Sequence, residues 1–497
     1  MLTESPPGPS TRRRPYRATY AVLAVGTSAY SLLQSLVSPV LPLLETELHT
    51  DQATVTWVLT AYLLSASVFT PIIGRVGDMI GKGRMLVVAL GVLAVGSVLA
   101  ALASSIGVMI VARAIQGVGG GVIPLAFGII RDEFPRPKVP AAVGTVAALL
   151  AVGGGAGLVL AGPIVNTLDY HWLFWIPAIM VGAAAVATHF VVPPSPVRTA
   201  GRVNWLAAIL LSSWLVALLL AISEAPRWGW TSVTVIGLIV ASVVLAAAWI
   251  RVELRAREPL IDMRMMRAPA VWSTNLVAFL FGAGLYTVFA FLPEFIQTPR
   301  SAGYGFGASV TESGFIVLPM AVAMFVFGQL AAPLSSRFGS RSVLIAGSAV
   351  SVLPFLMLAL AHDRIWEVSV ATGLLGVGFG LAFSAMSNII VDVVPSHQTG
   401  VASGMNANIR TIGGSIGAAV VASVVTAQLQ ASGLPTESGY VTSYLVLAAV
   451  LVLAALAGLL IPTTTPERDA HQIEQGSLRH PAMAIVAAGT LVGDDPE

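Results

Sequence analysis

The chain has 497 residues, of which 56% are hydrophobic and only 10% charged, with a mean hydropathy of +0.85 and a formal net charge of +2. Charged residues usually form about a quarter of a soluble domain, so this composition excludes a soluble protein and indicates a chain whose main solvent is lipid. The absence of cysteine excludes disulfides, thiolate metal sites and cysteine nucleophiles.

Apolar runs of roughly 18 to 25 residues, long enough to cross a bilayer as helices, recur along the whole chain. The first run is too long for the apolar region of a cleaved signal peptide, so we expect an uncleaved span. Six spans are expected at 18–44, 52–73, 85–104, 106–130, 141–164 and 171–193, two at 205–222 and 231–250, and six at 270–296, 310–334, 341–361, 365–391, 399–427 and 440–461. The sequence therefore predicts an all-α integral membrane protein with 14 transmembrane helices.

Basic residues fall almost entirely on one side of these spans. With an even number of spans both termini share a side, and 21 of the 26 Lys and Arg residues lie on it. The opposite side holds only Arg227, Arg300 and Arg364, and Arg113 and Arg410 lie within spans. Because cytoplasmic loops carry the excess of Lys and Arg, we predict cytoplasmic termini in a multi-pass protein of the plasma membrane.

An internal repeat divides the spans. The sequence GVGGG at 117–121 recurs as GVGFG at 376–380, and three further pairs of glycines agree with its offset within one residue, at 258 or 260 residues. Chance among 48 glycines is the alternative. The repeat predicts a 6+2+6 arrangement, as in transporters built from repeated bundles. The expected parts are a cytoplasmic N-terminal segment 1–17, a six-helix bundle 18–193, a linker with two inserted helices 194–250, a basic cytoplasmic loop 251–269, a second bundle 270–461 and a disordered cytoplasmic tail 462–497. A surface-lying amphipathic helix is the alternative for 251–269.

A glycine-rich basic motif, GRVGDMIGKGR at 74–84, separates the second and third spans. Glycines permit a tight turn, and Asp78 is placed to accept backbone N–H bonds or to face the positive end of a neighbouring helix. The sequence thus predicts a gate that can be made and broken, with these residues: Gly74, Asp78, Gly81, Lys82 and Arg84. The equivalent segment 335–341 has Ser336 in place of the acid, so only one half can form this contact.

Two arginines are expected deep in the membrane. A guanidinium there is costly unless it faces a cavity or a partner. Arg113 lies about eight residues into the fourth span, with Gln116 on the same helix face, and Arg410 follows Asn406 in the thirteenth span. For both arginines a purely structural role, with backbone carbonyls as partners, is the alternative. The side chains expected to line a central cavity are Tyr30, Gln34, Arg113, Gln116, Asn406 and Arg410.

Small residues dominate the fifth span, GGGAGLVLAGP at 153–163. Small residues let neighbouring helices approach closely, and a proline can bend a helix where its neighbours satisfy the lost hydrogen bond. The residues singled out are Gly153, Gly157, Gly162 and Pro163.

Together these motifs resemble the fourteen-helix drug:proton antiporter branch of the major facilitator superfamily. The 74–84 motif resembles the superfamily's hallmark loop, which implies a cytoplasmic gate that helps to hold the outward-facing state. Arg-Ala-Ile-Gln-Gly at 113–117 resembles its helix-four motif, which implies a part for Arg113 in proton coupling. The fifth span resembles the antiporter motif of exporters, although the family's Gly-Pro pair reads Gly157-Leu158 here. Generic close packing explains its glycines equally well.

Acidic residues are missing where this branch often has them. Leu33 occupies the position of an aspartate in the first span, and the tenth span carries no acid over 318–324. Glu294 and Glu312, near span ends, are the better candidates for proton binding, with ordinary solvated carboxylates as the alternative. The lack of deep acids favours neutral or anionic substrates over lipophilic cations.

The preferred interpretation is a secondary transporter that exports a small hydrophobic drug or metabolite by alternating access, driven by proton entry. A facilitator-type importer or uniporter of a polar small molecule is the alternative, and a membrane receptor or enzyme is a remote one. The histidines are scattered without metal-ligand spacing, so no catalytic residue, metal or cofactor is expected beyond the proton gradient. The expected partners are a small-molecule substrate and the lipid bilayer, with no nucleic acid, and the chain is expected to be a monomer.

Overall fold

The structure is a computed structural model that describes residues 16–462 except 51, 56, 194, 196–203, 257–258, 396–397, 426, 428–429 and 431–433. Within these residues, 14 helices are long and apolar enough to cross a membrane, which confirms the predicted all-α membrane fold. The expected tail at 462–497, apart from Pro462, and most of the N-terminal segment at 1–17 lie outside the described residues.

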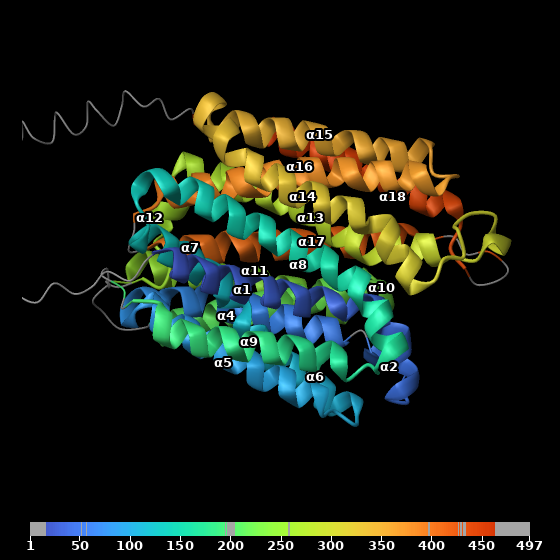
Figure 1. The fold of residues 1–497 in the computed structure, drawn as a ribbon, viewed down its shortest axis with the longest axis horizontal. Helices are drawn as coiled ribbons and strands as arrows, with labels where there is room; N and C mark the ends of the chain where they lie inside the picture. The colour runs from blue at the N-terminus through green and yellow to red at the C-terminus, as the bar shows by residue number, and fades with distance from the viewer. Residues whose placement is uncertain are drawn as a thin grey trace, which may run out of the picture. The chain divides into compact units, whose positions relative to one another are not determined.

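The long helices follow the 6+2+6 order (Figure 1). The first six spans are α1 (Tyr16–Leu36), α4 (Trp57–Ile80), α5 (Lys82–Ala101), α6 with α7 (Ile106–Gly117 and Val122–Glu133, joined by the 3₁₀ turn η2, Val118–Gly121), α8 (Val139–Thr167) and α9 (Trp172–Val191). The inserted pair is α10 (Trp205–Trp228) and α11 (Val233–Arg255). The last six are α13 (Pro269–Gln297), α14 (Val310–Phe338), α15 (Ser340–Leu360), α16 (Ile365–Val393), α17 (Thr399–Val425) and α18 (Glu437–Gly458).

Short elements connect the spans. They are η1 (Ser38–Val40), α2 (Leu41–Glu47), α3 (Gln52–Val55), η3 (Arg136–Lys138), α12 (Met263–Met266) and η4 (Arg300–Ala302). Several span starts are fixed by side chains that accept from the first turn, which satisfies N–H groups that have no partner within the helix. Ser309 and Glu312 form a complete capping box at the start of α14, and Asn204 caps α10.

Each half has its own buried apolar cluster, one over α1 to α9 and one largely over α13 to α18. In Figure 1, α4, α5, α6 and α9 lie together on one side of the bundle, and α14, α15, α16 and α18 on the other. The halves meet along two seams, one between α8 and α14 and the other between α4 and α17.

The inserted pair covers the second seam. Side chains of α10, among them Leu211 and Leu215, share a buried cluster with Ile72 of α4 and with Met405 and Ile412 of α17. The helix α10 therefore contacts both halves of the protein. By contrast, α11 presents much of its surface outward, with Val233 88% exposed.

The segment after the inserted pair is folded back on α11. Glu253, which is only 3% exposed, accepts hydrogen bonds from the Leu260 N–H at 2.9 Å and the Ile261 N–H at 3.3 Å. The first residues of the expected basic loop 251–269 are helical, because α11 continues to Arg255, and α12 contributes four more helical residues.

Candidate transport cavity and basic-end gate

A cavity of about 420 Å³ lies between the two halves. It is lined by residues of α1, α4, α6, α7, α8 and α10 and of α13, α14, α16 and α17. Most of the lining is apolar or aromatic, with a few polar groups, which is the usual composition of a small-molecule site. Of the side chains expected there, Tyr30, Gln34, Arg113 and Arg410 line the cavity, whereas Gln116 and Asn406 do not.

Arg113 is held by the first half and reaches the cavity with its tip. Its Nε donates to the Val58 carbonyl at 3.0 Å, one terminal nitrogen donates to Gln116 Oε1 at 2.6 Å, and its guanidinium lies 4.4 Å from the centre of the Tyr62 ring. Gln116 in turn donates to Ser97 Oγ at 3.2 Å. Arg113 therefore makes hydrogen bonds within the first half and also lines the cavity. Gln116, which does not line the cavity, holds the arginine in position.

Arg410 has a different environment. Its guanidinium lies 5.2 Å from the centre of the Phe383 ring, and it makes no side-chain hydrogen bond or ion pair with any other described residue. Its neighbour Asn406 points away from the cavity and donates to Asn275 Oδ1 at 2.8 Å. Of these two residues of the thirteenth span, Arg410 thus lines the cavity and Asn406 packs against α13.

Among the described residues, no carboxylate lines the cavity. Leu33, in the position where the resembled branch carries an aspartate, is fully buried in the core of the first half. Met324 of α14 faces the cavity instead of an acid. The polar groups of the lining are two guanidiniums, an amide and several hydroxyls.

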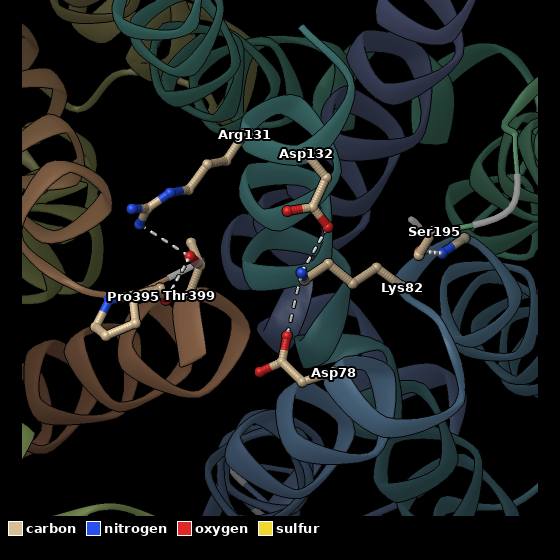
Figure 2. A network of polar contacts seen from close by, with 8 residues as sticks. Asp78, Lys82, Arg131, Asp132, Ser195, Pro395 and Thr399 are labelled. Carbon is tan, nitrogen blue, oxygen red and sulfur yellow. Dashed lines mark hydrogen bonds and ion pairs between the residues drawn. The ribbon is translucent and has the colours of Figure 1, made fainter. Parts of the chain in front are cut away.

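One end of the bundle bears Arg75, Lys82, Arg131 and Lys138 and is called here the basic end. A second buried polar cluster lies at this end, where α4 and α7 end and α5 begins. Lys82 Nζ lies 2.6 Å from Asp132 Oδ2 and 3.4 Å from Asp78 Oδ1, as Figure 2 shows, and the three side chains are between 0% and 2% exposed. Two carboxylates thus share one ammonium in a buried site.

Asp78 also faces the other half of the protein. Its carboxylate lies at the first turn of α17, beside the Val401 N–H, and a Cβ at Gly400 would lie 3.1 and 3.2 Å from its two oxygens. The N-terminal end of a helix attracts negative charge. Arg131 makes a second contact across the seam by donating to Thr399 Oγ1 at 3.0 Å (Figure 2). Further along, Asn408 donates to the Ser67 carbonyl at 2.5 Å. These contacts close the α4–α17 seam at the basic end.

The expected turn over 74–84 is mostly helix. Gly74 to Ile80 complete α4, Lys82 to Arg84 begin α5, and only Gly81 breaks the helices, with a φ of 111°. The other glycines serve close packing, since a Cβ at Gly74 would lie 2.7 Å from the Gly400 carbonyl. Arg84 is exposed and outside the cluster, and Ser336, at the equivalent place in the second half, is exposed and donates to the Pro333 carbonyl.

The glycines of α8 serve two different neighbours. Gly153 and Gly157 face α1, where a Cβ would lie 2.7 Å from the Ser28 carbonyl and 3.0 Å from the Leu32 carbonyl, respectively. Gly155 and Gly162 face Ala321 and Thr311 of α14. The helix continues through Pro163 to Thr167. This helix is therefore packed closely on one face against its own half and on another against the opposite half.

The two carboxylates proposed from sequence lie away from the cavity. Glu312 is occupied by the capping box, where it accepts from the Ser309 N–H at 2.8 Å. Glu294 lies near the end of α13, with an exposed side chain beside Tyr440.

Three residues of the gate, Asp132, Arg131 and Thr399, were not predicted as site residues from the sequence. The pair Arg131-Asp132 at the end of an apolar span was the available signal for the first two.

The sequence profile of the Major Facilitator Superfamily matches residues 23–301 and again residues 274–493. The chain belongs to this superfamily. That assignment makes it a transporter and not an enzyme.

Several relatives of this transporter have names that describe resistance or export. It is 28% identical over 424 residues to the tetracenomycin C resistance and export protein of Streptomyces glaucescens, covering 84% of this chain and 77% of that protein. It is 28% identical over 382 residues to multidrug resistance protein 3 of Bacillus subtilis, covering 74% and 72%. Among solved structures, the human organic anion transporter MFSD10 (TETRAN) matches with a TM-score of 0.66 at 16% identity, covering 89% of this chain and 99% of that one. At that identity the match supports the fold alone.

Proposed function

We propose that this protein is a secondary transporter that exports a small hydrophobic drug or metabolite across the plasma membrane in exchange for protons. The observation that carries the proposal is a mostly apolar cavity between two related halves whose α4–α17 seam is closed at the basic end. The names of the relatives support export. The basic end is assigned to the cytoplasm by its charge, with both termini there. A monomer is proposed as the working unit, because one chain supplies the whole lining of the cavity.

The proton is proposed to bind at the gate instead of within the cavity. Asp78 and Asp132 share Lys82 in a buried site, and the Arg131 guanidinium is a further positive charge near Asp132. Keeping two carboxylates ionised in a buried site is costly even beside cations, so proton binding to either carboxylate lowers that cost. A neutral Asp78 attracts the N-terminal end of α17 less, which links protonation to opening of the basic end. Arg113 of α6 lines the cavity next to Tyr62 of α4, the helix that also carries Asp78. Substrate binding beside Arg113 is proposed to affect the gate through α4.

The test is transport by purified full-length protein in proteoliposomes loaded with a fluorescent hydrophobic dye at two internal and external pH values. Dye movement is expected toward the side from which protons flow, and it is expected to stop when an ionophore collapses the pH gradient. Arg113→Ala is expected to reduce gradient-driven movement by about tenfold, because it leaves Gln116 Oε1 without its donor and removes the contacts of Arg113 with Val58 and Tyr62 of α4. Movement that equilibrates the dye without regard to pH would support the facilitator alternative and contradict the exchange. An Arg113→Ala variant with normal transport would remove Arg113 from the coupling.

A further inference from the structure

The cavity has a positive charge that the protein itself does not neutralise. Arg113 and Arg410 both line it, and no carboxylate of the described residues does. Arg113 has a carbonyl and an amide oxygen as partners, but Arg410 has only the face of the Phe383 ring. A guanidinium carries five N–H donors in a fixed planar fork. Because an unpaired guanidinium deep in a membrane is costly, such groups mark substrate or ion sites.

The backbone that carries Arg410 is tightly held. A Cβ at Gly282 would overlap the Arg410 carbonyl, and a Cβ at Gly413 would overlap the Phe279 carbonyl, so α13 and α17 are in close contact at the arginine and one turn after it. The Asn406–Asn275 hydrogen bond lies one turn away. The guanidinium is thus presented from a fixed helix, as a preorganised site requires.

The groups that face Arg410 from the surrounding helices are neutral. They are the phenols of Tyr30 on α1 and Tyr286 on α13 and the ring of Phe383 on α16. Tyr62 and Phe289 add two more aromatic side chains to the same cavity. Aromatic side chains favour stacked or edge-on packing against a flat aromatic ligand. The site therefore combines an apolar aromatic wall with one cation that has no hydrogen-bond or ion-pair partner among the described residues.

We infer that the transported compounds are planar aromatic anions, with the ionised oxygen group bound by the Arg410 guanidinium and the ring system held between the cavity's aromatic side chains. A carboxylate or sulfonate can accept two parallel N–H bonds from one guanidinium, and a phenolate oxygen can accept a single charge-assisted one. A lipophilic cation of the same size meets two guanidiniums and no carboxylate. This inference rests on the proposed function for its direction of transport, and it assigns the substrate class of the same cavity.

The test uses two dyes with the same xanthene ring system and opposite charge, fluorescein and rhodamine 123, and full-length protein in nanodiscs at pH 8. Equilibrium binding is measured by fluorescence anisotropy without any pH gradient. Fluorescein is expected to bind at least about tenfold more tightly than rhodamine 123, the difference expected from about 1.4 kcal/mol of charge preference. Arg410→Gln is expected to weaken fluorescein binding by about tenfold or more and to leave rhodamine 123 binding unchanged or stronger. Arg410→Lys is expected to recover part of the loss.

Arg251→Gln is the matched control, because it removes one exposed positive charge from α11, outside the cavity lining. Fluorescein should also raise the thermal stability of the native protein and of Arg251→Gln. Arg410→Gln is expected to keep a cooperative unfolding transition, which shows that it is folded, and to show no shift with fluorescein, which shows that it has lost the site. Tighter binding of rhodamine 123 than of fluorescein, or equal fluorescein binding by Arg410→Gln, would overturn the inference. Fluorescein binding that depends on Arg410 without movement in a pH gradient would contradict the proposed function alone. Movement of rhodamine 123 but not fluorescein would contradict the substrate class alone.

Discussion

Replacing Asp78 with asparagine is expected to lower gradient-driven export by about tenfold or more at unchanged protein abundance. The amide keeps the shape but removes the charge that attracts the first turn of α17 and one of the carboxylates beside Lys82. Losing a buried charge-assisted contact costs about 1.5–3 kcal/mol, and every 1.4 kcal/mol is about tenfold in an equilibrium. The measurement is dye export from proteoliposomes with a fixed pH gradient.

The same variant should leave the basic end open more often. Because the chain has no cysteine, Ser403→Cys on α17, where Ser403 is only 8% exposed, provides a single reporter. Its labelling by a water-soluble maleimide from the basic end is expected to be faster in the Asp78→Asn background. Ser336→Ala is the matched control in the second half, since that hydroxyl is exposed and makes no contact across the seam. Equal labelling rates with and without Asp78 would remove it from the gate.

Replacing Gly155 with leucine is expected to abolish export and to lower the yield of monodisperse protein. A Cβ at this position falls on the Ala321 side chain of α14, so even the first added carbon requires α8 and α14 to move apart. Overpacking a well-packed interface costs roughly 1–3 kcal/mol, and this interface is one of the two seams that join the halves. Size-exclusion chromatography and thermal unfolding in detergent provide the measurements.

Gly182→Leu is the control for that substitution. Gly182 lies in α9, also within a membrane span, and an added Cβ there meets no atom within 4 Å. Both variants add the same apolar volume and the same helix propensity to a transmembrane helix. A large loss at Gly182 together with a small one at Gly155 would contradict the packing assigned to α8.

Local sequence properties determined the spans, which is why they could be predicted. Each helix is long and apolar enough to satisfy its own backbone in lipid, and this property is visible in one stretch of sequence. The ends were less accurate, because charged and glycine-rich residues such as those at 74–80 extend α4 beyond the apolar run. Those residues are helical because packing against α17 covers them, and that partner lies more than 300 residues away in sequence.

Depth and polarity were sufficient to place Tyr30, Gln34, Arg113 and Arg410 on the cavity, but they could not separate cavity residues from the residues that support them. Gln116 is one turn from Arg113 and equally polar, yet it turns toward Ser97. Asn406 pairs with Asn275 on a neighbouring helix. Such partners depend on how helices are rotated against one another. The contact of Asp132 could not be predicted for the same reason, because its partner Lys82 comes from a different span.

The inserted helix α10 touches both α4 and α17, the two helices that must separate when the basic end opens. Opening therefore has to detach α10 from at least one of them and uncover apolar side chains such as Ile72 or Met405. In water that exposure is strongly unfavourable, but acyl chains cover it at little cost, because lipid tails are as apolar as the side chains. We therefore expect lipid molecules to enter and leave this crevice in each transport cycle. The composition and fluidity of the bilayer then help to set how fast this transporter turns over.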